Sequence, residues 1–422
     1  MEKIICSLEE WDSIINYYRP NGSSKTWYIK ELRKLTRPLM WGDWNIYTES
    51  GEMFDVGVFQ SIITPYYSKK IEYLQYDKIE DNKHIYIINI YNVQFFNDNK
   101  EIGFKCISQK YLEDVRNGKS KIVMFFLFEG YSGSHGNNDL EIIEKWRIEA
   151  GLPVDSVYYV CGNLLCRILV NQKGYGYQAR PVHHFEPWNK YDDPNIVEFK
   201  PVDNKYLFLS YNRAPRQHRV VFIIELMKQK LLNIGMVSLN KLIQDVPDDT
   251  PIEISEYLRN YTPLVIDEKY DLNYNLAINI TKEDYEKTFV SVVTETLVDQ
   301  GTIFFSEKIW KPIMVGHPFI LLGNRFSLKY LKNIGYKTFD KWIDESYDNE
   351  ADVSTRVKMI VNELKKFNSK SINELKKIRE EMNEVCEYNK KHYNESYRMN
   401  YDDGDVSTSI SNILDEVWKE LN

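Results

Sequence analysis

The sequence has few cysteines and no long apolar run. Its five cysteines are odd in number and scattered along 422 residues, so they predict neither a disulfide framework nor a zinc motif. No run of about 18 apolar residues is present, so we expect no transmembrane helix. The short, charged start of the chain is not typical of a signal peptide. We therefore expect a cytoplasmic protein with free thiols.

An excess of positive charge is also absent. The chain carries 54 Lys and Arg against 62 Asp and Glu, a net charge of -8, whereas tight nucleic-acid binding usually requires a basic surface. The Walker pattern, the Gly-x-Gly-x-x-Gly fingerprint, the Gly-x-Ser-x-Gly elbow and His-Glu-x-x-His are all missing from the sequence. The missing nicotinamide fingerprint argues against an epimerase-like enzyme.

The sequence does contain an ordinary globular composition and enough residues for two or three domains. Hydrophobic residues make up 43% and charged residues 27%, which is typical of soluble proteins, and domains commonly hold about 100–200 residues. The 31 tyrosines suit surfaces that stack on sugars or bases, although an AT-rich genome explains them more simply. A turn at 192–195 places the boundary between two halves near residue 200.

The first half contains a strand–helix–strand unit with a candidate acid or base. An apolar run at 121–128 predicts a strand buried on both faces. It is followed at once by Glu129 and by a glycine-rich loop that holds Tyr131 and His135. An amphipathic helix and a strand at 157–161 complete a βαβ unit. A carboxylate directly after a buried strand is placed as a catalytic acid or base would be; the alternative is a helix-capping or salt-bridged side chain.

The second half opens with a strand at 206–210 that runs into a basic loop. Three arginines stand within seven residues, just before a helical stretch: Arg213, Arg216 and Arg219. Arginine binds phosphate through a bidentate fork, so the loop is a candidate phosphate site; the alternative is a solvated, charged turn. We expect Gly235 to cap the helix that follows.

A second cluster follows the strand expected at 289–294. Glu295 stands directly after that strand, and Ser306 is a candidate N-cap of a helix whose backbone N–H groups would favour an anion. The first turns of this helix carry an acid and two cations, Glu307, Lys308 and Lys311. Pro312 is expected to keep the helix short or kinked. The alternative is a solvated Glu–Lys pair four residues apart.

The remainder of the second half predicts a strand at 318–322, a helix at 327–333 and a short strand at 336–339. The order strand, loop, helix and strand is the one in which open α/β sheets bind ligands at the carboxyl ends of their strands. Charged helices are expected over 350–395, and a final amphipathic helix over 407–421.

The segment Ser306-Glu307-Lys308, followed by a helix and by the Pro-Phe-Ile strand at 318–320, resembles the donor-site motif of GT-B glycosyltransferases of the α1,3-fucosyltransferase type. It is also similar to glycosyltransferase-like proteins of phages and large viruses. The similarity covers residues 200–345. It implies an α/β fold with two Rossmann-like domains that face a central cleft. Residues 1–200 would form the acceptor-side domain, residues 201–400 the donor domain, and residues 401–422 a helix that packs back.

The resemblance implies an inverting, metal-independent transfer of a sugar from a nucleotide-diphosphate donor to an acceptor hydroxyl, on a glycan or another acceptor. Glu307 would take the ribose, and Lys308 with an arginine of the 213–219 loop would take the diphosphate. The other candidates for the donor pocket are Glu295, Ser306 and Lys311. Glu129 would act as the base, with Tyr131 and His135 on the acceptor side and His135 and His218 as reserve bases. Neither a metal nor any other cofactor is expected.

Two alternatives remain open at this point. A sugar transferase acting on modified DNA bases, as in viruses, would bind DNA in a salt-sensitive way, and the acidic net charge argues against it. A non-catalytic GT-B-like binding protein would bind its ligand without turnover. A viral protein would work in the host cytoplasm. The sequence does not determine the oligomeric state.

Overall fold

The computed structural model describes residues 4–8, 45–47, 53–55, 71–74, 79, 82–89, 104, 107, 109–126, 139–181, 193–201, 206–212, 214–242, 246–264, 266, 280–298, 302–401 and 406–422. The chain divides into two compact units. Unit 1 comprises Met1–His183 with Met399–Asn422, and unit 2 comprises His184–Arg398. Each unit is described by itself.

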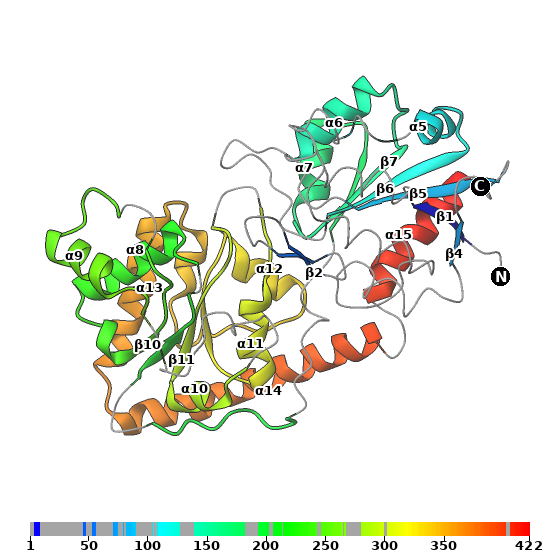
Figure 1. Cartoon of the computed structure of the whole chain (residues 1–422). Coiled ribbons are helices and arrows are strands. Elements are labelled where there is room, and N and C mark those ends of the chain that lie inside the picture. The colour runs from blue at the N-terminus through cyan, green and yellow to red at the C-terminus, as the bar shows by residue number, and fades with distance from the viewer. Residues whose placement is uncertain are drawn as a thin grey trace. The chain divides into compact units, whose positions relative to one another are not determined.

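Unit 1 contains a six-stranded parallel sheet in the order β4-β1-β5-β6-β7-β8 (Figure 1). Its strands are β1 (Ile4–Leu8), β4 (Ile71–Leu74), β5 (His84–Asn89), β6 (Ser120–Phe126), β7 (Val157–Cys161) and β8 (Gln178–Pro181). A separate antiparallel pair is formed by β2 (Asn45–Tyr47) and β3 (Met53–Asp55). Side chains of β5, β6, β7 and β8 are buried in a core that they share with three helices. These helices are α5 (Gln109–Arg116), α6 (Asp139–Glu149) and α7 (Cys166–Lys173).

The last helix of the chain, α15 (Val406–Leu421), packs against β1, β5 and β6 of unit 1. Leu414 and Val417 of its apolar stripe are fully buried. Polar contacts hold the same helix at its end: Glu420 accepts hydrogen bonds from Lys121 and Tyr158. Burial, followed by the hydrogen bond to Glu420 and its charge, raises the pKa of Tyr158.

Unit 2 contains a four-stranded parallel sheet in the order β10-β9-β11-β12. The strands are β9 (Phe208–Ser210), β10 (Gly235–Val237), β11 (Val290–Thr294) and β12 (Phe319–Leu322). From β9 the chain moves outward on one side to β10, and then crosses to β11 and β12 on the other side. The strand order therefore reverses between β9 and β11, and such a switch point is where open α/β sheets bind ligands.

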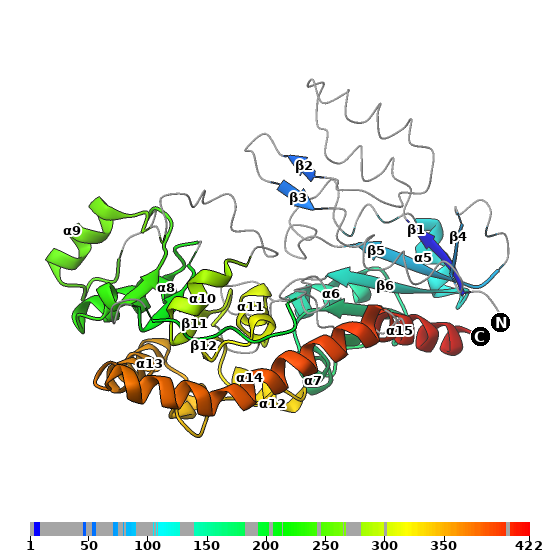
Figure 2. The same ribbon diagram turned by 90° about the horizontal axis from the view of Figure 1, so that it is seen from below.

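Helices cover both faces of the unit 2 sheet. Phe208 of β9 meets Phe222 of α8 (Gln217–Lys228) edge to face, with ring centroids 6.4 Å apart. The next residue, Leu209, clusters with Tyr285 of α10 (Lys282–Lys287) and with Val315 of α11 (Glu307–Val315). Because successive strand residues point to opposite faces, α8 lies on one face and α10 with α11 on the other. Figure 2 shows α10 and α11 on one side of β11 and β12.

The remaining helices complete unit 2. They are α9 (Ile252–Tyr261), α12 (Ser327–Asn333), α13 (Val353–Asn368) and α14 (Ile372–Tyr401), with short 3-10 helices η4 (Leu232–Ile234) and η6 (Glu345–Asn349). Helix α13 packs beside α8 and against β12. The last residues of α14 belong to unit 1. Among the helices described, none has both the length and the apolar character needed to cross a membrane.

Two local predictions are wrong. Helix α8 ends at Lys228, and Gly235 is not its cap: its φ of -112° is extended and it opens β10. A Cβ on Gly235 would lie 2.3 Å from the Phe208 ring, so close packing requires glycine there. Residues 336–339 form no strand. Their backbone is bonded by a side chain instead, because Asn389 accepts from the Lys337 N–H and donates to the Lys337 carbonyl, both at 2.8 Å.

The protein is thus an α/β protein with two parallel sheets, which is compatible with the predicted Rossmann-like folding. Residues 121–126 of the apolar run predicted at 121–128 lie in β6, and the predicted strand at 157–161 coincides with β7. The predicted helix at 327–333 coincides with α12.

Candidate functional site

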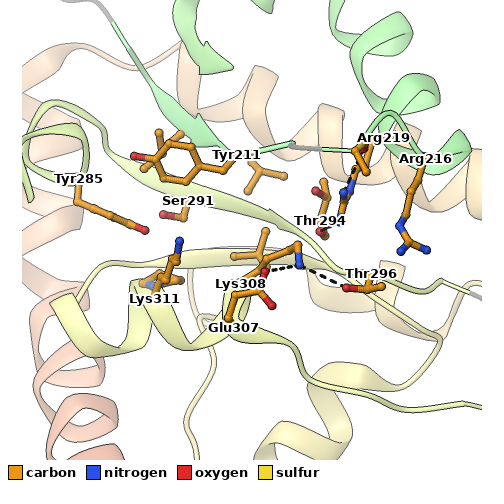
Figure 3. Close-up of a pocket in the computed structure, with 15 residues that line it drawn as sticks. Tyr211, Arg216, Arg219, Tyr285, Ser291, Thr294, Thr296, Glu307, Lys308 and Lys311 are labelled. Carbon is orange, nitrogen blue, oxygen red and sulfur yellow. Dashed lines mark hydrogen bonds and ion pairs between the residues drawn. The ribbon is translucent and has the colours of Figure 1, made fainter. Parts of the chain in front are cut away.

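A cavity of about 300 Å³ opens at the switch point of unit 2 (Figure 3). Strands β9 and β11 line one side of the cavity, the first turns of α11 line the facing side, and the loops that follow β9 and β11 form the rim. Tyr285 of α10 also lines it. Its lining residues are Leu209, Tyr211, Ala214, Arg216, Arg219, Tyr285, Ser291, Val292, Val293, Thr294, Thr296, Glu307, Lys308, Lys311 and Pro312.

Helix α11 begins at the cavity because Ser306 is its N-cap. Ser306 has an extended backbone, with φ -90° and ψ 177°, and its hydroxyl accepts a hydrogen bond from the Lys308 N–H. The helix therefore presents its N-terminus and the side chains of Glu307, Lys308 and Lys311 to the cavity. Pro312 lies inside this nine-residue helix and also lines the cavity, in keeping with the prediction of a short helix.

Lys308 is held by three oxygens on the rim of the cavity. Its Nζ lies 2.6 Å from Glu307 Oε1, 3.2 Å from Ser306 Oγ and 3.3 Å from Thr296 Oγ1. Burial raises the pKa of Glu307, but the charge and hydrogen bond of Lys308 outweigh burial, so the net shift is downward. Glu307 thus forms a close ion pair with the adjacent Lys308.

Lys311, on the same helix, is more buried than Lys308. Its residue surface is only 7% exposed. Burial is the main cause that lowers the pKa of Lys311; Glu307 opposes this shift and Lys308 adds to it, and the resulting pKa is about 8. In Figure 3 its ammonium points toward Ser291 and Tyr285 on the far side of the cavity from Arg216. A lysine that gives up its proton near pH 8 makes the charge of this cavity sensitive to pH.

Arg219 reaches the cavity from the first turn of α8. It is 2% exposed, and its two Nη atoms donate to the carbonyl oxygens of Ala214, Thr294 and Glu295, each at 3.1 Å. Its Nε is buried and finds no hydrogen-bond partner within the described part of the chain. Burial lowers the pKa of Arg219 to about 10, with a further contribution from Arg216, so the guanidinium remains charged at neutral pH.

Arg216 completes the cationic rim. It is the N-cap residue of α8, it is exposed, and Figure 3 shows its side chain beside that of Arg219. Four cationic side chains therefore line the cavity, and its lining among the described residues contains one carboxylate, that of Glu307. Both α8 and α11 begin here, and helix N-termini carry partial positive charge. The arrangement suits an anion with more than one charged group.

Glu295 lies behind the cavity wall and is not part of its lining. It is 1% exposed, and its carboxylate accepts hydrogen bonds from the Ser306 N–H and hydroxyl and from the Thr296 N–H. Burial raises the pKa of Glu295, against the opposing effects of Lys308 and Ser306. Its carbonyl oxygen accepts from Arg219 and lies 2.9 Å from His218 Nε2. Glu295 thus links the starts of α8 and α11.

His218 lies outside the cavity lining. Burial lowers the pKa of His218 to about 3, and the charges of Arg219, Arg216 and Lys308 add to this effect. The ring is therefore neutral at physiological pH. It donates from Nε2 to the carbonyl of Glu295, since a neutral ring nitrogen facing a carbonyl oxygen must carry the hydrogen.

Several lining residues were not predicted as site residues from the sequence, among them Tyr211, Tyr285 and Ser291. Ser291 is the one polar residue between valines in β11, and that break in an apolar run was the available signal. Tyr285 belongs to a charged, six-residue helix, and no pattern there indicates a cavity. Four predicted site residues lie outside the described residues: Glu129, Tyr131, His135 and Arg213. In the described ranges, no three His, Cys, Asp or Glu side chains gather as metal ligands would.

The fold and this cavity define an α/β protein with a cationic pocket at a topological switch point. No protein-family model and no curated protein matches the sequence. The function is therefore inferred from the geometry of the pocket.

Proposed function

We propose that the protein is a glycosyltransferase of GT-B architecture that takes its sugar from a nucleotide-diphosphate donor bound in unit 2. The observation that carries the proposal is the convergence of Arg216, Arg219, Lys308 and Lys311 on one switch-point cavity. These cations come from two different strand–helix junctions. A diphosphate carries two linked anionic groups. Several cations spaced along one cavity fit such a ligand better than they fit an ion with a single charged atom. The presence of a parallel sheet in each unit supports the GT-B part of the proposal.

In this proposal each side chain has a chemical task. The buried guanidinium of Arg219 places a fixed positive charge beside the phosphate oxygens, and Lys308 donates to them from its ammonium. As the bond between sugar and phosphate breaks, negative charge grows on the leaving diphosphate, and these fixed cations stabilise it. Glu307 accepts hydrogen bonds from hydroxyl groups of the ribose. Glu129 remains the predicted base that removes the proton of the acceptor hydroxyl.

The proposal is tested by measuring binding and thermal stability with pyrophosphate, with nucleoside diphosphates and with nucleotide sugars. We expect at least one nucleoside diphosphate to bind and to raise Tm, because a ligand of the native state stabilises it. Lys308→Ala should lower that affinity about tenfold or more, since a charged hydrogen bond contributes about 1.5–3 kcal/mol.

Lys366→Ala is the matched control for Lys308→Ala. Lys366 pairs with Glu363 at 2.6 Å, the same distance as between Lys308 and Glu307, but it lies outside the cavity lining. Its loss should leave ligand affinity unchanged. A wild-type protein that binds none of these phosphates would contradict the proposal.

The pH dependence of binding provides a separate prediction. The negative charge that a bound diphosphate brings into the cavity favours the protonated form of Lys311, which lines the same cavity and whose pKa in the ligand-free protein is about 8. Affinity should therefore be highest below pH 8 and should fall as the pH rises through 8, by about tenfold between pH 7 and pH 9 for one linked proton. Titration calorimetry of wild type and Lys311→Met over this range is the measurement. The variant should bind more weakly at pH 7 and show no such decline; equal slopes for the two proteins would exclude Lys311 from the site.

A further inference from the structure

The hydroxyl of Ser291 is held in one orientation by His317. Ser291 Oγ lies 2.9 Å from His317 Nδ1, and His317 Nε2 lies 2.9 Å from the carbonyl oxygen of Thr288. His317 is 2% exposed, and burial lowers its pKa to about 3, so the ring is neutral. A neutral imidazole has one N–H, and the carbonyl of Thr288 requires it on Nε2. Nδ1 is then an acceptor, and the hydroxyl of Ser291 must donate to it.

This orientation determines what Ser291 offers to the cavity it lines. Its only hydrogen points to His317, so only oxygen lone pairs remain for a ligand. A phosphate oxygen beside Ser291 would face those lone pairs without receiving a hydrogen bond. A ligand O–H or N–H group would be accepted there. This end of the cavity therefore disfavours an anion next to Ser291 and favours a hydrogen-bond donor.

Lys311 supplies the complementary group. Its ammonium points toward Ser291 (Figure 3), and an ammonium only donates. A hydroxyl group between the two side chains can accept from Lys311 and donate to Ser291 at once. Tyr211 and Tyr285 line the same region, with ring centroids 6.3 Å apart, and aromatic side chains suit the apolar faces of a sugar ring. The chemistry of this end is that of a sugar hydroxyl.

We propose that Ser291 and Lys311 bind a hydroxyl of a sugar ring attached to the diphosphate, so that the ligand is selected for that hydroxyl. This inference rests on the proposed function, because the proposed diphosphate at the rim brings the sugar to this end. Successive residues in a strand are spaced by about 3.3 Å, so Ser291 lies about 10 Å along β11 from Thr294 at the rim. The hydroxyl can belong to the ribose of the nucleotide or to the transferred sugar, and the experiment distinguishes them.

The experiment measures dissociation constants of wild type, Ser291→Ala and Ser291→Cys for two ligand series. The first series compares a ribonucleoside diphosphate with its 2′-deoxy and 3′-deoxy forms. The second compares the nucleoside diphosphate with its nucleotide sugars. Cysteine keeps the side-chain size but is a weak acceptor, so it guards against a packing defect in the alanine variant. Ser210→Ala is the matched control: Ser210 is a buried strand serine that donates to the Val292 carbonyl at 3.0 Å and does not line the cavity.

Wild type should lose about tenfold in affinity when the recognised hydroxyl is missing. Both Ser291 variants should lose that preference, and Ser210→Ala should keep it. Loss of the preference in the first series assigns the hydroxyl to ribose, and loss in the second series assigns it to the transferred sugar. The inference is overturned if the Ser291 variants keep the wild-type preference for the ribose hydroxyls and for the attached sugar. It is also overturned if wild type binds nucleoside diphosphates but prefers neither the ribose hydroxyls nor the attached sugar. If wild type binds neither pyrophosphate nor any nucleotide, the proposed function itself fails.

Discussion

Replacing Arg219 with methionine is expected to lower the affinity for a nucleoside diphosphate about 100-fold. The guanidinium is the most deeply buried of the four cations among the described residues that line the cavity. Its position is fixed before the ligand arrives, because the Nη atoms are bonded to three carbonyl oxygens. A preorganised, charged hydrogen bond costs little entropy on binding and contributes about 1.5–3 kcal/mol. Calorimetry of wild type and variant measures the loss.

The same substitution removes donors from three carbonyl oxygens and is expected to lower stability, so it requires a control that separates the two effects. Arg379 is also 2% exposed, also has an unpartnered Nε, and donates to the Val197 and Gly316 carbonyls at 3.1 Å. It does not line the cavity. Arg379→Met should therefore lower Tm and keep the ligand affinity. Arg219→Lys should bind more weakly than wild type, since lysine lacks the planar fork. If Arg219→Met bound the nucleoside diphosphate with wild-type affinity, the diphosphate would not be bound at this site.

The buried strands are the part of the fold that the sequence predicts best. Strand β7 (Val157–Cys161) is a continuous apolar run that is buried at every position, and such runs are typical of parallel sheets with both faces covered. The order of the strands in the sheet is harder to predict from the sequence. An apolar run shows that a strand is buried, but it does not show which strand lies beside it. The placement of β9 next to both β10 and β11, which creates the switch point, depends on contacts between distant parts of the chain.

In the site, too, features that depend on neighbouring residues in the sequence could be predicted, whereas features that depend on contacts between distant residues could not. The two cationic clusters are visible in the sequence, and the structure brings Arg216, Arg219, Lys308 and Lys311 to one cavity. The orientation of Ser291 is not visible, because it depends on His317, which is 26 residues away in the chain. Similarly, the sequence cannot distinguish a Glu295 that faces a ligand from one that faces the backbone of Ser306, since the intervening loop decides between them.

Replacing Glu295 with alanine is expected to destabilise unit 2 by about 3 kcal/mol. The Ser306 N–H, the Ser306 hydroxyl and the Thr296 N–H all donate to this buried carboxylate, and buried donors that lose their acceptor cost about 1–3 kcal/mol each before relaxation. For a unit of this size, about 3 kcal/mol corresponds to a decrease in Tm of about 6–12 °C. Thermal unfolding followed by circular dichroism measures it.

Glu295→Ala should also weaken binding of a nucleoside diphosphate, because the carboxylate holds Ser306, and Ser306 in turn caps α11 and contacts the Lys308 ammonium at 3.2 Å.

Glu345 offers a matched comparison. It is another carboxylate whose pKa burial raises; it accepts from the Phe339 N–H and the Thr338 hydroxyl and lies 3.2 Å from Lys332. Glu345→Ala removes the same kinds of contact away from the cavity lining, so it should lower Tm and leave the dissociation constant unchanged. If both variants lost stability and both bound ligand as wild type does, Glu295 would support the fold without positioning Lys308. A weaker dissociation constant in Glu295→Ala alone, measured well below its Tm, would show that the link between the starts of α8 and α11 sets the geometry of the cationic cavity.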